Sequence, residues 1–388
     1  MFSPEIPRRD RVLGASANRR QFLAGTAALS AGTLLPGLSR LAPRTQHVIL
    51  VAFAGGVRTR ETFGTPANIP NLARLAKEGV VYHRARTANL GHFGASLSIF
   101  TGIAEARGIR ENSRGEDPTV FEYARKELGL APSDVWIATS GGAQQANYAS
   151  SIHPDYGARY AANTLDGDGI FNQEFKRLLD AYGRPKEMEA RERELLDRLR
   201  GAIGGQRSAE DVARSANDAK IENYILDELT RGTVDLRGTG AADAKALRVA
   251  RNLLSIFRPK LLGVVLRDAD VAHGNFNAYQ EVIRRNDAML GELIAAVQDD
   301  PELAESTAIF VLPEFGRDAD LNSRRGLDHG DGSDDINYVS IAAWGPDFQR
   351  GVVSNNEVRT IDVAATIGTL MDFQGRYVRG KKLPKLFA

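Results

Sequence analysis

The chain has 388 residues, of which 43% are hydrophobic and 26% charged, and its formal net charge is +1. This composition is typical of a globular chain with one large or two medium domains. The small net charge gives no reason to expect a nucleic-acid partner. The chain has no cysteine, which excludes disulfides, thiolate metal sites and cysteine nucleophiles.

The first forty-odd residues have the parts of an export signal in the right order. The segment NRRQFL at residues 18–23 precedes a weakly apolar run rich in Ala, Gly and Thr that ends near Pro43. This order is typical of a signal peptide, and the paired arginines resemble a twin-arginine signal. We therefore expect residues 1–43 to engage the twin-arginine export machinery, and the mature protein to be periplasmic or secreted. The alternative is a chance Arg-Arg pair in a disordered basic tail.

No segment elsewhere in the chain reaches about 18 consecutive apolar residues, so no stable membrane span is expected.

Strand-like and helix-like segments alternate after Thr45. Residues 47–53 are almost wholly apolar and end at a glycine turn, which is the pattern of a strand buried on both faces. The next segments are a helix at 71–79, a strand at 80–82, a Gly/Ser-rich loop at 87–102, a helix at 119–128 and a strand at 134–139. This alternation predicts an α/β fold over residues 46–388, with a doubly wound, mostly parallel sheet and helices on both faces.

The composition of the sequence changes between residues 155 and 243. This segment is charged, favours helix and lacks strand-like runs. We interpret it as a helical insert that covers the cleft of the α/β domain rather than as a separate domain.

Two later apolar runs, at 261–266 and 307–312, end abruptly in acidic residues or histidine. The first is followed by DADVAH at 268–273, where Asp270 and His273 form the closer pair and Asp268 is the alternative. Ligands bind beyond the carboxyl ends of parallel strands, and carboxylates with imidazoles are suitable ligands for a divalent cation. The other interpretation is a solvated acidic loop with an incidental histidine.

The second run adds further candidates of the same kind. Glu314 follows it directly, and the pair Asp328 and His329 lies a short loop further on. Three such groups in one C-terminal segment predict a metal site.

Several segments together resemble the alkaline phosphatase superfamily, in its sulfatase-like branch. That branch has a TPNLDRLAAEG helix and a nucleophile loop that closes in SLLTG; this chain has TPANIPNLARLAKEG at 65–79 and ASLSIFTG at 95–102. The segment VRTIDVAATI at 358–367 resembles the closing DIAPTIL helix of the family. The segments EFGR at 314–317 and GLDH at 326–329 resemble the DUF1501 proteins, which commonly carry twin-arginine signals.

The resemblance implies an exported, metal-dependent hydrolase of a phosphate or sulfate ester. One divalent cation (Zn, Mn or Ca) would be held by Asp270, His273 and His329. A second or shared cation would be held by Glu314 and Asp328, with Glu61 as a further candidate. Such cations would polarise an oxygen of the ester and stabilise an in-line displacement.

The chain departs from the family pattern at three positions. Ala54-Gly55 stands where the first strand usually ends in an aspartate ligand, and Phe315 stands where a histidine is common. Counting back from Thr101 places His92 at the nucleophile position, where it could be a covalent nucleophile, a base, a metal ligand or a remnant. The alternative function is therefore a catalytically degenerate sulfatase-like protein that binds a ligand or partner.

Overall fold

The computed structural model describes residues 43–109, 113–140, 146–167 and 236–388. The export signal predicted at 1–43 and most of the insert predicted at 155–243 lie outside the described residues. The described residues all belong to one compact unit. Within the described ranges, no helix is both long and apolar enough to cross a membrane.

The core of this unit is a mixed, mostly parallel sheet whose strand order is β4-β3-β5-β1-β6-β7-β2-β8, with β9 paired to β2. Its strands are β1 (His47–Phe53), β2 (Val80–Arg86), β3 (Val135–Thr139), β4 (Asn163–Asp166), β5 (Leu261–Leu266), β6 (Thr307–Pro313), β7 (Tyr338–Trp344), β8 (Val352–Ser354) and β9 (Val358–Arg359). Strand β1 pairs in parallel with β5 and β6, whereas β7 runs antiparallel to β6 and β2. The predicted α/β fold class is confirmed.

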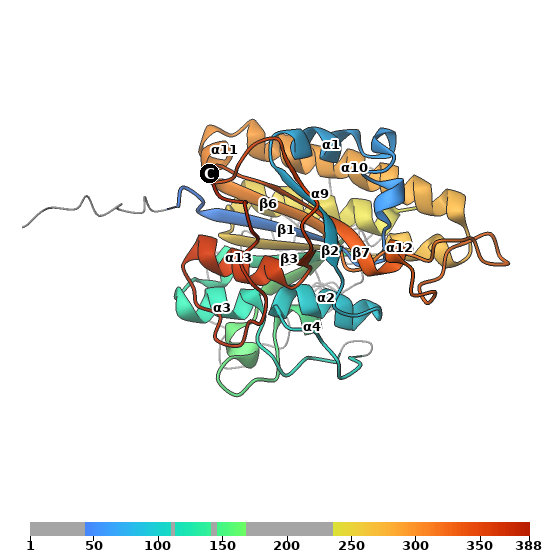
Figure 1. Cartoon of the computed structure of the whole chain (residues 1–388). Coiled ribbons are helices and arrows are strands. Elements are labelled where there is room, and N and C mark those ends of the chain that lie inside the picture. The colour runs from blue at the N-terminus through green and yellow to red at the C-terminus, as the bar shows by residue number, and fades with distance from the viewer. Residues whose placement is uncertain (1–42, 110–112, 141–145, 168–235) are drawn as a thin grey trace, which may run out of the picture. The chain divides into compact units, whose positions relative to one another are not determined.

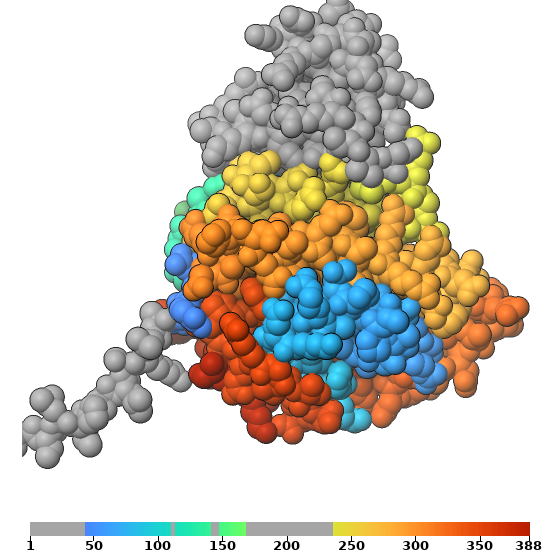
Figure 2. Space-filling view, turned by 90° about the horizontal axis from the view of Figure 1, so that it is seen from above, coloured from blue at the N-terminus to red at the C-terminus, as the bar shows by residue number. Residues whose placement is uncertain are grey.

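Helices cover both faces of the sheet (Figure 1). One face carries α1 (Pro70–Lys77), α9 (Ala241–Phe257), α10 (Phe276–Gln298) and α11 (Pro301–Ser306). The other carries α2 (His92–Thr101), α3 (Val120–Glu127), α4 (Ala146–Ala149) and α13 (Asp362–Met371). A short helix α12 (Asp334–Asn337) precedes β7. Figure 2 shows α9, α10 and α1 side by side across the first face.

Strand β1 is buried along its whole length because it lies between these two helical layers. Ile49 and Val51 belong to the apolar cluster under α9 and α10, whereas Val48 and Leu50 belong to the cluster above α3 and α13. Alternate side chains of a strand point to opposite faces, so an unbroken apolar run is needed here. Each buried side chain contributes about 1.5–3 kcal/mol. The carboxyl end of β1 is thereby fixed in the centre of the molecule.

The structure differs from the sequence prediction in two segments. The loop predicted at 87–102 contains α2, whose residues from Gly94 onward are buried; burial against the sheet outweighs the weak helix propensity of its Gly and Ser residues. The helical insert predicted from residue 155 contains strand β4, which pairs in parallel with β3 at the edge of the sheet. These four residues contain no apolar run, so the sequence gives no signal for a strand. The strand forms because its backbone pairs with β3.

Candidate metal centre

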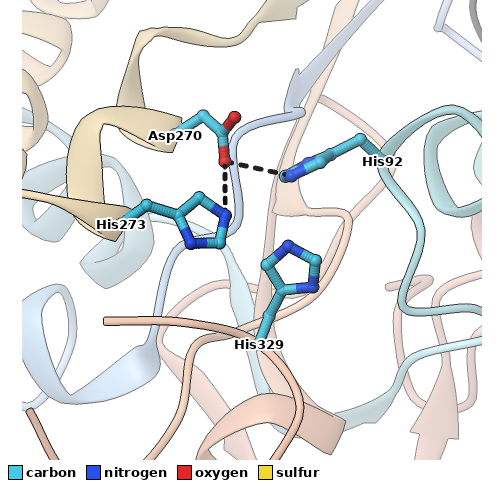
Figure 3. Close-up of side chains that lie close together, drawn as sticks. All are labelled: His92, Asp270, His273 and His329. Atoms are coloured by element: carbon cyan, nitrogen blue, oxygen red, sulfur yellow. Dashed lines mark ion pairs between the residues drawn. The ribbon is translucent and has the colours of Figure 1, made fainter. Parts of the chain in front are cut away.

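Four side chains converge beyond the carboxyl ends of β1, β5 and β6. They are His92, Asp270, His273 and His329, and one ligand atom of each lies within 4.8 Å of the corresponding atoms of the others. Figure 3 shows the three imidazoles and the carboxylate directed toward a common point. Atoms that bind one cation at 2.0–2.6 Å lie at most about 5 Å apart, so the described residues contain a group with the spacing of a metal site.

Asp270 and His273 reach this point from η7 (Asp268–His273), a 3-10 helix that begins one residue after β5. Side chains three positions apart are eclipsed in a 3-10 helix, which places both on the same side. Asp268 instead accepts a hydrogen bond from the backbone N–H of Asp243 at 3.0 Å. Asp270, and not the alternative Asp268, is therefore the carboxylate of the group.

His92 enters the group as the first residue of α2. Its Nδ1 lies 2.6 Å from Glu314 Oε1 and 3.1 Å from the carbonyl oxygen of Ala54. Both neighbours are acceptors, so Nδ1 carries the hydrogen. The opposite nitrogen, Nε2, is buried, lies 3.0 Å from Asp270 Oδ1 and makes no hydrogen bond. A buried nitrogen that makes no hydrogen bond, and whose neighbour is a carboxylate oxygen of the same group, suits a metal ligand.

The electrostatics of His92 depend on the carboxylates around it. Burial lowers its pKa, but the carboxylates of Asp270 and Glu314 outweigh this effect and raise the pKa to about 9. The pKa of Asp270 lies well below its usual range, because the contributions of His92 and Arg317 exceed that of burial. A cation bound at Nε2 would replace the proton there, since metal binding to imidazole releases protons.

His273 repeats the arrangement of His92. Its Nδ1 lies 2.6 Å from Asp328 Oδ1, and its Nε2 lies 3.4 Å from Asp270 Oδ1. The second oxygen of Asp328 accepts a hydrogen bond from Asn322 Nδ2 at 2.9 Å. His273 and Asn322 together lower the pKa of Asp328. A carboxylate on the outer nitrogen of an imidazole fixes its tautomer and its orientation toward a metal.

His329 lies on a loop that is joined to η7 through the backbone. The N–H of Leu327 donates to the carbonyl oxygen of Ala272 at 2.7 Å, and Leu327 is fully buried. The His329 ring lies 5.0 Å from the rings of His92 and His273. Burial, and then the positive charge of its neighbours, lowers the pKa of His329 to about 4. The ring is therefore neutral at pH 7, as a ligand must be.

Gly326 provides the close approach of this loop to η7, and its replacement is expected to separate them. A Cβ at this position would lie 2.3 Å from the carbonyl oxygen of Ala272. We expect Gly326→Ala to lower the free energy of unfolding by about 1–3 kcal/mol, and to weaken metal binding because His329 is displaced. Urea denaturation and metal titration would measure the two effects.

Gly330, four residues later, is the matched control. A Cβ there would meet no atom within 4 Å, so Gly330→Ala should leave both quantities unchanged. Equal effects of the two substitutions would contradict this account of the loop.

Arg317 lies behind the group with none of its side chain exposed. Its Nη2 donates to Asp270 Oδ1 at 2.6 Å and also to the carbonyl oxygen of Gly55. Two further carbonyl oxygens, of Gly56 and Leu327, accept from the guanidinium at 3.3 Å. Arg317 thus connects the end of β1 with η7 and the His329 loop.

The sequence analysis assigned a second or shared cation to Glu314, Asp328 and Glu61, and in the structure each of these carboxylates contacts other side chains. Glu314 and Asp328 contact the outer nitrogens of His92 and His273, so they orient imidazoles. Glu61 is outside the group. Its Oε1 and Oε2 accept hydrogen bonds from Nη2 and Nε of Arg58 at 2.6 and 2.7 Å.

Two residues near the group had no catalytic or metal-binding role in the sequence analysis. Arg317 was quoted only as part of a motif, and its ion-pair partner is Asp270, which lies 47 residues earlier in the chain, so no local pattern indicates this role. Ser96, which lies in the ASLSIFTG segment, is fully buried and donates to Glu314 Oε2 at 2.5 Å. Together with His92, it satisfies both oxygens of this buried carboxylate. No sequence pattern connects Ser96 with Glu314, because the two residues lie far apart in the chain.

Comparison with known proteins was made for both sequence and structure. No protein-family model and no curated protein matches the sequence. Two solved structures of the alkaline phosphatase PafA, one of them a variant, align with TM-scores of 0.56 and 0.59 at 11% identity, over 90% of this chain and 99% of theirs. A phosphonate monoester hydrolase from Silicibacter pomeroyi aligns with a TM-score of 0.51 at 14% identity, over 87% of this chain and 75% of its own. At these identities the likeness concerns the architecture: the chain has an alkaline phosphatase-like α/β fold.

Proposed function

We propose that this protein is a metal-dependent hydrolase of a phosphate or sulfate ester. The observation that carries the proposal is the convergence of His92, Asp270, His273 and His329 at the carboxyl end of the central strands. The outer nitrogens of His92 and His273 are held by buried or partly buried carboxylates. Such carboxylate–histidine pairs are typical of metal centres.

The chemistry of the four ligands favours a transition metal. Three imidazoles and one carboxylate suit Zn²⁺ or Mn²⁺, whereas Ca²⁺ prefers a shell of six to eight oxygens. Of the three cations expected from the sequence, we therefore propose Zn or Mn. When bound, such a cation would polarise an ester oxygen and lower the pKa of a water molecule.

The residues around the group favour water as the attacking species. Ser96, the nearest hydroxyl on α2, is fully buried and donates to Glu314, so it is not available as a nucleophile. His92 has its Nδ1 bound to Glu314 and its Nε2 directed at the common point. Of the roles considered for His92, metal ligand is the one that this geometry supports.

The structural neighbours support the choice of substrate class. They include an alkaline phosphatase and phosphonate monoester hydrolases, which share this fold. Phosphate and phosphonate monoesters are therefore the first substrates to test, followed by phosphodiesters and sulfate esters.

The test combines metal content with turnover. The protein would be stripped with a chelator, reloaded separately with Zn²⁺, Mn²⁺ and Ca²⁺, and assayed with aryl phosphate, phosphonate, phosphodiester and sulfate substrates. Turnover should appear with Zn²⁺ or Mn²⁺ and be lost in His329→Ala but not in His153→Ala, a histidine that instead packs against Tyr156 and Tyr377. Metal binding without turnover would favour the alternative, a degenerate protein that binds a ligand or partner. No metal binding would contradict the proposed hydrolase.

Glu314→Gln is expected to weaken metal binding by about 10–100-fold, as for other outer carboxylates of metal-bound imidazoles. The amide cannot accept from both Ser96 and His92 as the carboxylate does. Glu61→Gln is the matched control, since Glu61 is a buried carboxylate that contacts Arg58 rather than the group. Glu61→Gln should lower the free energy of unfolding. It should leave the metal dissociation constant within about threefold of the wild-type value, a smaller change than the 10–100-fold expected for Glu314→Gln. Isothermal titration of both variants would show whether the effects differ in this way.

We also propose export of this protein through the twin-arginine route to the periplasm or the exterior, supported by the NRRQFL segment at 18–23. Replacing Arg19 and Arg20 together with Lys should retain the protein in the cytoplasm, as cell fractionation would show. Export of the Lys-Lys variant at the normal level would contradict a twin-arginine signal.

A further inference from the structure

We infer that the metal centre takes one divalent cation, and that the buried guanidinium of Arg317 supplies the positive charge that a second cation would bring. The inference rests on the proposed function and adds the number of ions. It follows from three features of the described residues: the contacts of Arg317, the space at the end of β1, and the charges around the group.

The contacts of Arg317 place a fixed cation at the ligand Asp270. The guanidinium donates to Asp270 Oδ1 at 2.6 Å, the same oxygen that faces His92 and His273. Its remaining contacts are to carbonyl oxygens at the end of β1 and in the His329 loop. A fully buried cation needs an anionic partner and acceptors for its N–H groups. Asp270 is the anionic partner of Arg317, and the three carbonyl oxygens are the acceptors.

The end of β1 has no space for a further side-chain ligand. A Cβ at Gly55 would lie 2.5 Å from the carbonyl oxygen of Arg267 and 2.7 Å from the backbone nitrogen of Asp270. A Cβ at Gly56 would lie 2.8 Å from Nε of Arg317. An aspartate at Gly55 or Gly56 is therefore sterically excluded, and the guanidinium occupies the space beside Gly56.

The charges of the group balance with one divalent cation. Three carboxylates, those of Asp270, Glu314 and Asp328, contact the imidazoles directly. Arg317 and one divalent cation together neutralise them, whereas a second divalent cation would leave two uncompensated positive charges in a partly buried site. Arg324 also lies 3.2 Å from Asp328, but its side chain is 63% exposed, so solvent screens its charge.

The number of ions would be measured directly on the wild-type protein. The chelator-treated chain would be titrated with Zn²⁺ in a calorimeter, and the bound metal would be counted by native mass spectrometry and elemental analysis. One ion per chain is expected. Two ions per chain would overturn this inference and leave the proposed function standing, whereas no bound ion would contradict the proposed function and the inference together.

Two substitutions separate the charge of Arg317 from its packing. Arg317→Gln removes the positive charge, and we expect the single Zn²⁺ to bind at least about tenfold more tightly because the repulsion is lost. Arg317→Lys keeps the charge, so it should bind Zn²⁺ more weakly than Arg317→Gln does, because the charge repulsion is retained. Equal affinities of the two variants would show that the charge has no role and would overturn the inference.

Arg58→Gln is the matched control for these variants. Arg58 is likewise buried, but its partner is Glu61, outside the group. The substitution should lower the free energy of unfolding without changing the Zn²⁺ affinity. A change of affinity in Arg58→Gln equal to that in Arg317→Gln would mean that loss of any buried arginine alters binding, and would count against the inference.

Discussion

Asp270→Asn is expected to reduce the affinity for Zn²⁺ or Mn²⁺ by more than about 100-fold, beyond the effect of losing an outer carboxylate. Asp270 is the only carboxylate among the four converging side chains, and its Oδ1 faces His92 and His273. The same substitution leaves the buried guanidinium of Arg317 without its anionic partner. Breaking such a pair destabilises a protein, and because Asp270 is 38% exposed we expect a loss of up to about 3 kcal/mol.

Calorimetric titration of the chelator-treated protein and urea denaturation would measure these two effects. Asp268→Asn is the control, because this carboxylate lies two residues earlier on η7 but accepts a hydrogen bond from the first turn of α9. It should bind the metal as the wild type does. Unchanged metal affinity in Asp270→Asn would remove this residue from the ligand set.

Asp243→Asn is expected to remove a large pH dependence of stability. Asp243 is fully buried near the start of α9, and burial, followed by the charge of Asp268, raises its pKa from 3.8 to about 7. Because the pKa is higher in the folded state, the folded protein holds the proton more firmly than the unfolded chain. The stability present below about pH 4 therefore declines as the pH rises towards 7.

The hydrogen bonds around Asp243 allow an amide in its place. Its Oδ1 accepts from the backbone N–H groups of Arg267 and Asp268, and its Oδ2 accepts from Asn286 Nδ2 at 2.7 Å. Asn286 Oδ1 has no hydrogen-bond partner. Rotation of the Asn286 amide would let it accept from the new amide at position 243, so the variant should fold and be more stable than the wild type above pH 7.

Urea denaturation between pH 4.5 and 8 would test this expectation. Asp300→Asn is the control, because the backbone N–H of Leu303 lowers the pKa of Asp300. Its contribution to stability is present above pH 3.8 and is lost only at lower pH, so this variant should parallel the wild type throughout the range. A wild-type slope that persists in Asp243→Asn would show that other groups cause it.

The central part of the fold could be predicted from the sequence because burial on both faces leaves a strong signal. The apolar runs at 47–53 and 261–266 coincide with β1 and β5. None of the residues that pair these two strands is polar. The same reasoning fails for β4 and α2. Strand β4 is held by backbone pairing with β3, and α2 by burial against the sheet, and neither interaction depends on a local pattern.

The candidate site could be predicted in its residues more readily than in their roles. The principle that parallel strands end at one edge brought Asp270, His273 and His329 together, and counting from a motif identified His92. The sequence could not show that Glu314 contacts the outer nitrogen of His92, because that depends on which side of an imidazole faces the cation. Nor could it show that Glu61 would be held by Arg58, only three residues away.

The backbone hydrogen bond between Leu327 and Ala272 limits which residues of the His329 loop can change during evolution. It fixes the separation of His273 and His329 through main-chain atoms, and within the intervening loop Asn322 adds side-chain hydrogen bonds to the carbonyl oxygen of His273 and to Asp328. Residues 318–325 form an irregular loop, and lengthening such a loop costs little entropy. We therefore expect homologues to vary in sequence and length there except at Asn322, while Gly326 and the four converging side chains persist. The same loop is the place to graft new substrate contacts.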